Sequence, residues 1–339
     1  MSSDEGRGTS MLPAVTVVGA GIVGLWQAYM LAFRGHDVHL VEQSQTLFRR
    51  SASASAGAML APFCERATAP ALIQDLGLRA LDIWRDTFPG VVSNGTLVLA
   101  HPNEYSELVR FSRLTEGYRP VNSEELAKLE PDLADRFNAG LFYAEEAHVE
   151  PTAAAAHLLR TIRRLGGRVT FGHTWSDDDA DYVIDCRGMD ASHDIASLRG
   201  VRGERIVVQT PNVALTRPIR LLHPHAPLYL VPWDMGTYMI GATVIESEEQ
   251  GPITLRSAMD LLASVLALHP GFGDARIVAL DAGVRPAFPD NVPRIVTNGR
   301  HISVNGLYRH GFLLAPALAE LVADHLAGEA AQSPLVFAE

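Results

Sequence analysis

The first forty residues carry the pattern of a strand, a turn, a helix and a second strand. Residues 14–18 (AVTVV) form a short apolar run rich in β-branched side chains, which is typical of a buried strand. A glycine turn follows at residues 19–24, and residues 22–33 predict a helix that ends before Gly35. Residues 38–41 (VHLV) predict the next strand. Two strands joined by a helix indicate a parallel pair in a doubly wound α/β sheet.

Related units return in the middle and at the end of the chain. A helix is expected to start at Pro151 and to end at Gly166, and a closing helix is expected over residues 313–326. Between residues 204 and 243, apolar and polar positions alternate and prolines interrupt them, which predicts antiparallel strands. The other expected elements are helices at 72–87, 104–115, 123–128 and 255–268, and strands at 95–100, 168–171, 182–186, 277–280 and 301–304.

These patterns predict an α/β fold, and a length of 339 residues suits two domains. The economical architecture is a discontinuous Rossmann-like nucleotide-binding domain of three segments, with a second α+β domain built on an antiparallel sheet. The first domain is expected at residues 11–65, 150–200 and 283–330. The second is expected at residues 66–149 and 201–282, and residues 1–10 are interpreted as a loose tail.

The N-terminal apolar run imitates a membrane span. Residues 11–33 contain no charged side chain over 23 positions, which is long enough to cross a bilayer. Pro13 and the glycines divide this run into a strand, a turn and a helix, so no span is predicted.

Charge and cysteine content narrow the classes of partner. Lys and Arg number 28 against 39 Asp and Glu, a formal net charge of −11, so neither nucleic acid nor an anionic membrane surface is expected as a partner. Cys64 and Cys186 lie 122 positions apart, which is neither a disulfide framework nor a metal pair and fits a reducing cytoplasm. The four aspartates within residues 177–181 predict a solvated turn, and no metal site is expected.

The glycine turn carries the first chemistry. Gly19, Gly21 and Gly24 form a GxGxxG motif between a strand and a helix, and Glu42 ends the second strand. In this context the first glycine makes the turn, the second admits a pyrophosphate, and the third lets helix and strand pack closely. Glu42 would accept hydrogen bonds from a ribose diol, which argues against NADP. The motif alone leaves FAD and NAD open.

Several segments in the correct order extend this motif into a family resemblance. The chain resembles the D-amino-acid oxidase superfamily of flavoproteins, and within it the glycine oxidases of the thiamine-biosynthesis type. Besides the glycine turn and Glu42, the resemblance rests on SASASAGAMLAP (51–62), EEAHVEPTAAAAHLL (145–159), YLVP (229–232), IGAT (240–243), AGVRPAFPDNVP (282–293) and GLYRHGFLLAP (306–316).

The resemblance implies a glutathione-reductase-like fold that binds FAD. No cysteine follows Cys186, so the attachment is expected to be non-covalent. The implied reaction oxidises glycine or another small amino acid to its imine by hydride transfer to flavin N5, and O2 then reoxidises the flavin to give H2O2. The implied setting is thiamine (thiazole) biosynthesis in the cytoplasm, with a homo-oligomer left open.

The family's cofactor contacts can be carried over where the residues match. The segment around Ser53 would lie beside the flavin and the pyrophosphate, Val169 would contact the adenine end, and the amides that open the last helix would stabilise negative charge on the reduced flavin. The residues implied for the cofactor are Ser53, Ala56, Gly57, Met59, Val169, Gly188, Gly306, Gly311, Phe312 and Leu313.

Three residues are implied for the substrate. Arg285 matches the family arginine that binds the substrate carboxylate in a two-pronged fork, and Tyr229 matches a tyrosine whose hydroxyl donates to the same group. Arg309 matches an arginine that borders the active-site cavity. The residues alone leave two alternatives open: Arg285 as a structural arginine, and Tyr229 as a tyrosine that packs in the core.

Departures from the family pattern keep the substrate open. Trp233 stands where an arginine commonly follows YLVP, Ile245 stands where an acidic residue often follows GAT, and His310 replaces a usual asparagine. The alternatives are a D-amino-acid or sarcosine oxidase or dehydrogenase, a flavoprotein that acts on a partner protein, and an NAD-dependent dehydrogenase. Flavin colour and its bleaching by small amines would separate them.

Overall fold

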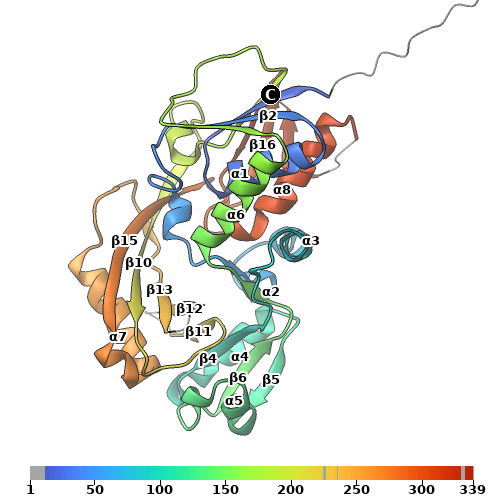
Figure 1. Cartoon of the computed structure of the whole chain (residues 1–339). Coiled ribbons are helices and arrows are strands. Elements are labelled where there is room, and N and C mark those ends of the chain that lie inside the picture. Colours follow the sequence, from blue (N-terminus) through green and yellow to red (C-terminus); the bar gives the residue numbers. More distant parts are fainter. Residues whose placement is uncertain (1–11, 224–226, 235, 330–332, 339) are drawn as a thin grey trace, which may run out of the picture.

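Two large sheets organise the molecule. The computed structural model describes residues 12–223, 227–234, 236–329 and 333–338, so the predicted tail at residues 1–10 lies outside the described residues. One sheet has seven strands and the other has nine. Figure 1 shows the seven-stranded sheet with α1, α6 and α8 in the upper half, and the nine-stranded sheet in the lower half.

The seven-stranded sheet joins three distant parts of the chain. Its strand β1 pairs in parallel with β2 on one side and with the central strand β9 on the other. β17 pairs in parallel with β9, and β16 runs antiparallel to β17. The order is β18-β16-β17-β9-β1-β2-β8, with bounds β1 Ala14–Val18, β2 Asp37–Glu42, β8 Arg168–Phe171, β9 Tyr182–Asp185, β16 Arg294–Asn298, β17 His301–Asn305 and β18 Val336–Ala338. The predicted α/β fold with a parallel sheet is confirmed.

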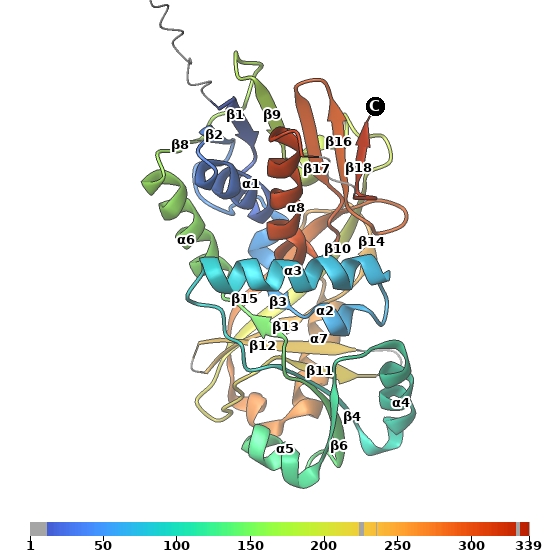
Figure 2. The ribbon, with the colours of Figure 1, turned by 90° about the vertical axis from the view of Figure 1, so that its right-hand side faces the viewer.

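Helices α1 (Ile22–Phe33) and α8 (Gly311–Leu326) supply the core beside this sheet. Both are apolar around most of their circumference, as expected for helices with two buried sides. They pack on each other and on α3 (Ala71–Thr87), while α6 (Pro151–Arg164) packs on α1. Figure 2 shows α3 crossing the middle of the molecule, below α8 and above the nine-stranded sheet.

A proline inside α8 leaves one backbone acceptor without its helical partner. Pro316 has no N–H, so the carbonyl of Phe312, four residues earlier, cannot receive the usual helical hydrogen bond. Trp84 of α3 fills the gap, because its indole Nε1 donates to the Phe312 carbonyl over 2.7 Å in the buried core. The side chain of one helix thus completes the backbone bonding of another.

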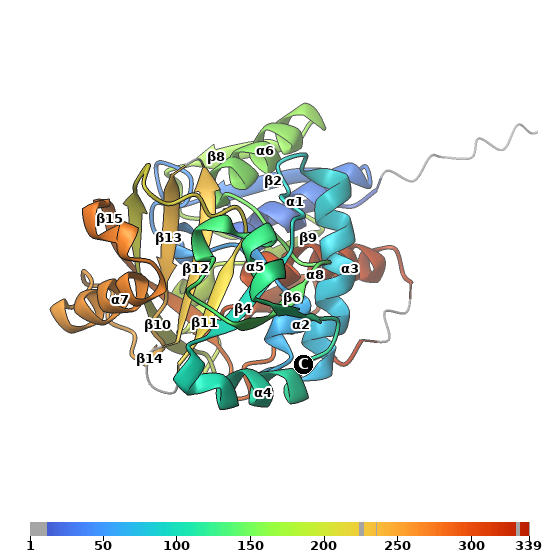
Figure 3. The ribbon, with the colours of Figure 1, turned by 90° about the horizontal axis from the view of Figure 1, so that it is seen from below.

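The nine-stranded sheet is mostly antiparallel. Its order is β14-β10-β13-β12-β11-β4-β6-β5, and β15 pairs with β10 at the edge. The bounds are β4 Thr96–Ala100, β5 Arg119–Asn122, β6 Ala139–Tyr143, β10 Arg199–Gln209, β11 Ile219–Leu222, β12 Leu228–Asp234, β13 Thr237–Gly241, β14 Ile245–Glu246 and β15 Arg276–Ala287. α7 (Leu255–Leu268) packs on this sheet, and Figure 3 shows α7 at the opposite side of the molecule from α3.

Short elements connect these layers. The helices are α2 (Pro62–Glu65), α4 (Tyr105–Leu114) and α5 (Ser123–Leu129), and β3 (Met59–Leu60) pairs with β7 (Ala147–His148) as a separate two-stranded sheet. Single 3-10 turns are η1 Ala52–Ser55, η2 Pro102–Glu104, η3 Pro131–Leu133, η4 Gly188–Ala191 and η5 Pro270–Asp274. In the described part of the chain, no helix has the length and apolarity needed to span a membrane.

The structure differs from the sequence predictions mainly in the second sheet. The predicted strand at 277–280 is the first part of the longer β15, which continues to Ala287 because β10 pairs with it along its length. β5 and β6 of this sheet were not predicted, nor were β16 and β18 of the seven-stranded sheet. α3 lies within the segment assigned to the second domain, yet it packs against α8. The domain boundaries stay a prediction.

Candidate active site

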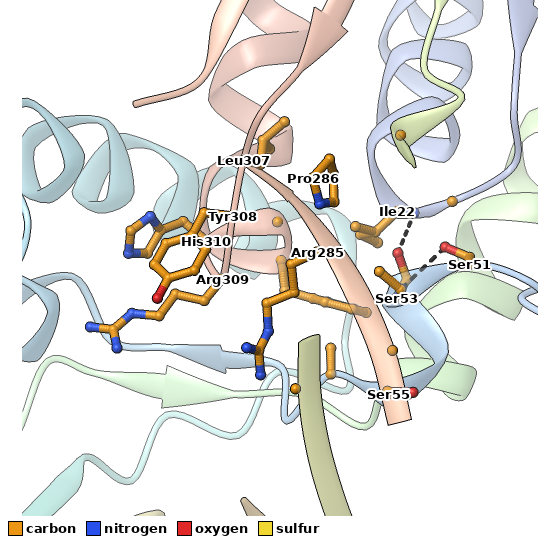
Figure 4. A pocket seen from close by; sticks show the side chains of 18 of the residues that line it. Ile22, Ser51, Ser53, Ser55, Arg285, Pro286, Leu307, Tyr308, Arg309 and His310 are labelled. Carbon is orange, nitrogen blue, oxygen red and sulfur yellow. Dashed lines mark hydrogen bonds between the residues drawn. The ribbon is translucent and has the colours of Figure 1, made fainter. Parts of the chain in front are cut away.

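A large cavity lies between the two sheets. Its volume is about 930 Å³, and its wall includes the carboxyl ends of β1, β2 and β9, the start of α8, and side chains of the nine-stranded sheet. In open α/β sheets ligands bind at the carboxyl ends of the strands, where the connections diverge. Figure 4 shows Ser51 and Ser53 on one side of this cavity and Arg285, Arg309 and His310 on the other.

The glycine turn has the close contacts that its motif predicts. Gly19 adopts a φ of +97°, and a Cβ on Gly24 would lie 1.8 Å from the carbonyl oxygen of Gly19. A Cβ on Gly21 would lie 3.0 Å from Ser51 Oγ, at the wall of the cavity. No larger residue fits the third position without a backbone shift.

Glu42 is fixed at the end of β2. One carboxylate oxygen accepts from the amide of Ala20 over 2.7 Å, and the other accepts from the amide of Ser44 over 2.8 Å. A carboxylate has about four acceptor positions, so both oxygens keep capacity for further donors. Glu42 lines the cavity, and this arrangement suits a diol.

The segment from Ser51 to Met59 forms the next part of the wall. Ser53 Oγ accepts from the amide of Ile22 at the start of α1, which ties this segment to the glycine turn (Figure 4). A Cβ on Gly57 would lie 2.2 Å from the methyl carbon of Met239, so the backbone of this segment touches the nine-stranded sheet. Ser53, Ala56, Gly57 and Met59 all line the cavity.

Besides Gly24, whose predicted role is helix–strand packing, two predicted cofactor residues do not line the cavity. Val169 pairs with Leu40 inside the sheet, and the cavity is lined instead by residues 173–175, which follow that strand. Gly306 has a φ of +77° and packs against Phe288, so it shapes the turn without lining the wall. Gly188, with a φ of +60°, does line the cavity.

The first turn of α8 faces the cavity. Gly311, Phe312 and Leu313 line the wall, and the first amides of a helix have no acceptor within the helix. The positive end of the helix dipole therefore points at the space that a ligand would fill.

These features fit FAD. The glycine turn and the start of α1 would hold the pyrophosphate, Glu42 the ribose, and the segment 51–59 with the first turn of α8 would hold the flavin end. The cradle at Gly21, where a side chain would meet Ser51, is the observation that supports this assignment.

Arg285 and Tyr229 both line the cavity. Arg285 of β15 donates from Nη1 to the carbonyl of Thr243 over 3.2 Å, and its Nη2 fills the space above Gly203. Among the described residues, no carboxylate pairs with Arg285, and no residue forms a hydrogen bond with the Tyr229 hydroxyl. Their donors are therefore available to a ligand.

Arg309 belongs to a buried ionic cluster that the sequence did not reveal. Its Nε donates to Glu65 Oε2 over 2.9 Å, and Arg220 Nη2 donates to Glu65 Oε1 over 2.7 Å. His310 Nε2 lies 2.9 Å from the same Oε2. Burial alone would raise the pKa of Glu65, but Arg309, Arg220 and His310 outweigh it and hold that pKa well below its usual range.

Glu65 and Arg220 are the cavity residues that sequence reasoning missed. Glu65 follows the 51–62 segment by three positions, and Arg220 is the single charge in the apolar strand IRLL. A charged side chain in such a strand was the available signal.

Strand pairing aligns several of these side chains across the second sheet. Arg220 of β11 pairs with Tyr229 of β12, and Tyr229 pairs with Gly241 of β13. Gly241 pairs with Arg205 of β10, and Arg205 pairs with Asp281 of β15. Directly paired residues share a face of the sheet, so this row forms one wall of the cavity.

Only one of the three departures from the family pattern lines the cavity. His310 is that residue. Trp233 packs its ring 5.1 Å below the guanidinium of Arg205, which also donates to the carbonyl of Ala56. Ile245 pairs with Arg202 at the far edge of the sheet.

The aspartates of the 177–181 turn have structural partners. Asp178 accepts from Thr16 Oγ1 over 2.7 Å, Asp181 accepts from the amide of Ala14, and Asp177 pairs with Arg300. Among the described residues, no cluster of His, Cys, Asp or Glu could hold a metal ion.

Comparison with known families defines the class of protein. Residues 14–325 match the DAO family, described as FAD dependent oxidoreductase. The chain belongs to this family and is an FAD-dependent oxidoreductase. The predicted family resemblance is confirmed.

Individual relatives cover nearly the whole chain. A Rhizobium etli protein assigned as the thiamine biosynthesis oxidoreductase ThiO is 48% identical over 320 residues, which span 94% of this chain and 98% of that protein. A glycine oxidase of Bacillus licheniformis is 28% identical and covers 92% of each chain.

Solved structures share the fold. Glycine oxidase from Geobacillus kaustophilus superposes with a TM-score of 0.79 at 24% identity, covering 96% of this chain and 97% of that one. L-proline dehydrogenase from P. horikoshii gives the same TM-score at 16% identity and covers 96% of both chains. Since two different substrates occur on this fold, the site has to decide the substrate.

Proposed function

We propose that this protein oxidises glycine, or another small amino acid, to its imine with non-covalently bound FAD, as a step of thiamine (thiazole) biosynthesis. The observation that carries the proposal is Arg285 in the wall of the proposed FAD cavity, an arginine that pairs with no carboxylate in the part of the chain that the structure describes. The 48% identical relative assigned to thiamine biosynthesis and the glycine oxidases support the same reaction.

Arg285 and Tyr229 would anchor the substrate. A guanidinium presents parallel N–H groups that match a carboxylate, and the free hydroxyl of Tyr229 adds a donor on the neighbouring wall. Fixing the carboxylate fixes the direction of the Cα–H bond, which lowers the entropic part of the barrier.

FAD, when bound, accepts the hydride from the substrate and returns the electrons to O2, giving H2O2. The chain's own contribution lies around that chemistry. The first-turn amides of α8 would stabilise negative charge, and the buried walls would exclude water. None of these roles needs a side-chain base.

An anaerobic titration with glycine tests the reaction. The purified yellow protein should lose its flavin absorbance near 450 nm, as flavins do on reduction, and it should form H2O2 when air is admitted. If N-methylglycine or a D-amino acid bleaches the flavin and glycine does not, the enzyme is one of the alternative oxidases. If no small amine bleaches it, a role on a partner protein replaces turnover.

Removing the arginine tests the anchor. Arg285→Ala should raise the KM for glycine roughly tenfold to a hundredfold, because hydrogen bonds to charged groups contribute about 1.5–3 kcal/mol each. Arg110→Gln changes another cavity arginine, one already paired with Glu107, and serves as the control. An unchanged KM in Arg285→Ala would remove the proposed anchor.

We further propose that the protein is cytoplasmic, that its substrate is a free amino acid and that O2 is the electron acceptor. A homo-oligomer is a further possibility for its assembly. Two buried free thiols, Cys64 and Cys186, support a reducing compartment. Fractionation of the native host and sizing of the purified protein test location and assembly.

A further inference from the structure

We infer that the cluster of Arg220, Arg309 and Glu65 is a second anion subsite, which takes a second acidic group on the ligand. The ligand class is a short amino acid with two carboxylates, and the same subsite would bind simple dicarboxylates. This inference rests on the proposed function, because Arg285 is expected to hold the first carboxylate.

The cluster carries more positive than negative charge. Two guanidinium groups share one carboxylate, since Arg220 lies 2.7 Å and Arg309 lies 2.8 Å from Glu65. The carboxylate is ionised, because its pKa is held well below the usual range. Glu146, another buried carboxyl near Arg220, is neutral near pH 6 because burial raises its pKa to about 7. At that pH one positive charge therefore remains uncompensated at this wall, even with His310 neutral.

Other arginines of the cavity do not have this surplus. Arg205 pairs with Asp281 over 3.0 Å, and Arg110 pairs with Glu107 over 2.7 Å. Arg49 and Arg50 are exposed and precede Ser51, on the side of the glycine turn. Among the described residues of the cavity wall, the positive charges that lie away from the glycine turn and lack full compensation are thus those of Arg285 and of the Arg220–Arg309 pair.

Donors of the cluster remain free for a ligand. Arg220 donates from Nη1 to the carbonyl of Cys64 and from Nη2 to Glu65. Arg309 donates from Nε to Glu65 and from Nη2 to Thr68 over 2.5 Å. Its Nη1 has no hydrogen bond among the described residues, and its side chain is 30% exposed, in the wall of the cavity.

The subsite lies next to the predicted carboxylate anchor. Arg220 is the cross-strand partner of Tyr229, and directly opposed side chains are neighbours on a sheet face. Figure 4 shows Arg285 and Arg309 on the same side of the cavity. A ligand that meets Arg285 and Tyr229 with one carboxylate therefore extends toward Arg220 and Arg309 with the rest of its length.

Binding measurements on the FAD-loaded protein test the subsite without turnover. Acetate is titrated against malonate, succinate and glutarate at pH 6, where Glu146 is neutral, and at low ionic strength, with the flavin absorbance spectrum as the readout. At least one dicarboxylate should bind ten times more tightly than acetate, beyond the twofold advantage of having two equivalent ends. Equal affinities within that factor of two would overturn the inference.

Three variants locate the effect. Arg220→Gln should reduce the preference for the dicarboxylate at least fivefold and leave acetate binding within a factor of two. Arg110→Gln, the matched change at a cavity arginine with its own carboxylate, should keep the preference. Glu65→Gln removes the compensating charge and should increase the preference, whereas a purely structural role of the cluster would make both Glu65→Gln and Arg220→Gln weaken every ligand.

The outcomes separate this inference from the proposed function. If acetate binds and glycine is oxidised, but no dicarboxylate is favoured, the inference alone is wrong. If neither acetate nor glycine binds, the proposed function falls and the subsite falls with it. The wild-type comparison decides the matter even if Arg220→Gln does not fold, and Arg309→Gln then replaces it with the same expected loss.

Discussion

At the scale of single residues, two buried groups at β7 have pKa values that are shifted in opposite directions: Glu146, just before the strand, and His148, within it. Burial raises the pKa of Glu146 to about 7 and lowers the pKa of His148 to about 4. Both side chains are almost completely buried, and Glu146 accepts from the amide of Cys64 over 2.8 Å. Both groups are therefore neutral in the folded protein near pH 6, next to the element that carries Glu65.

In the wild type, the opposite pKa shifts of Glu146 and His148 should have effects on folding stability that largely cancel. A variant that lacks one of these groups should show the effect of the other. Between pH 4.5 and 6.5 the unfolded chain loses the Glu146 proton that the folded protein keeps, so this group lowers stability as pH rises. His148 has the opposite sign, because the unfolded chain gains a proton as pH falls and the folded protein does not. Glu146→Gln should leave only the His148 trend, so its stability should gain on the wild type by about 2 kcal/mol over these two pH units.

Urea unfolding at pH 4.5, 5.5 and 6.5 measures this difference. His148→Asn is the complementary variant, and its stability should fall relative to the wild type over the same interval. Parallel stability curves for wild type and Glu146→Gln would contradict the opposing shifts.

At the scale of elements, α3 and α8 depend on each other through one hydrogen bond. Trp84 donates to the carbonyl that Pro316 leaves without a helical donor, and its ring stacks on Phe312 at 6.3 Å. Since Phe312 lies in the first turn of α8, this contact also positions the amides that face the cavity. A tryptophan in one helix thus supports the cofactor wall in another.

A double-mutant cycle tests this dependence. Trp84→Phe should cost about 1–3 kcal/mol of folding stability, because a buried carbonyl loses its donor. In a Pro316→Ala background the restored N–H can reach Phe312, so the same change should cost about 1 kcal/mol less. Thermal or urea unfolding of the four proteins gives the coupling, and additive effects would show that the indole bond is not replacing the missing helical one.

Locally patterned elements were predictable from the sequence, and features that depend on distant contacts were not. The helices at 22–33 and 255–268 and the strand at 168–171 have the predicted bounds, because each is marked by its own periodicity and stop signals. β15 extends well beyond 277–280 only because β10 pairs with it. Arg220 and Glu65 are 155 residues apart, so no local pattern joins them.

At the scale of the whole molecule, the cavity is shared between two sheets and the start of α8. The glycine turn, the segment after β9 and the first turn of α8 come from the beginning, middle and end of the chain. Side chains of β10, β11, β12 and β15 close the other side. A ligand in this space contacts elements from both sheets at once, so its binding should favour the folded state as a whole.

Cofactor binding should therefore appear as thermal stability. Protein stripped of FAD should melt at a lower temperature than the loaded protein, and the melting temperature should rise with the logarithm of added FAD. Saturation a thousandfold above the dissociation constant corresponds to about 4 kcal/mol. Differential scanning fluorimetry measures this, with riboflavin as the control because it lacks the pyrophosphate and ribose that the glycine turn and Glu42 would hold. A melting temperature independent of FAD would contradict the cofactor assignment.

The position of β17 in the sheet also sets an order of events during synthesis on the ribosome. β17 occupies the place beside β9, and α8, which directly follows it, packs on α1 near the other end of the chain. A nascent polypeptide that has not yet emerged to residue 326 lacks one wall of the cofactor chamber. Synthesis must therefore have passed α8 before FAD can be retained, and products that end before α8 should leave the ribosome colourless.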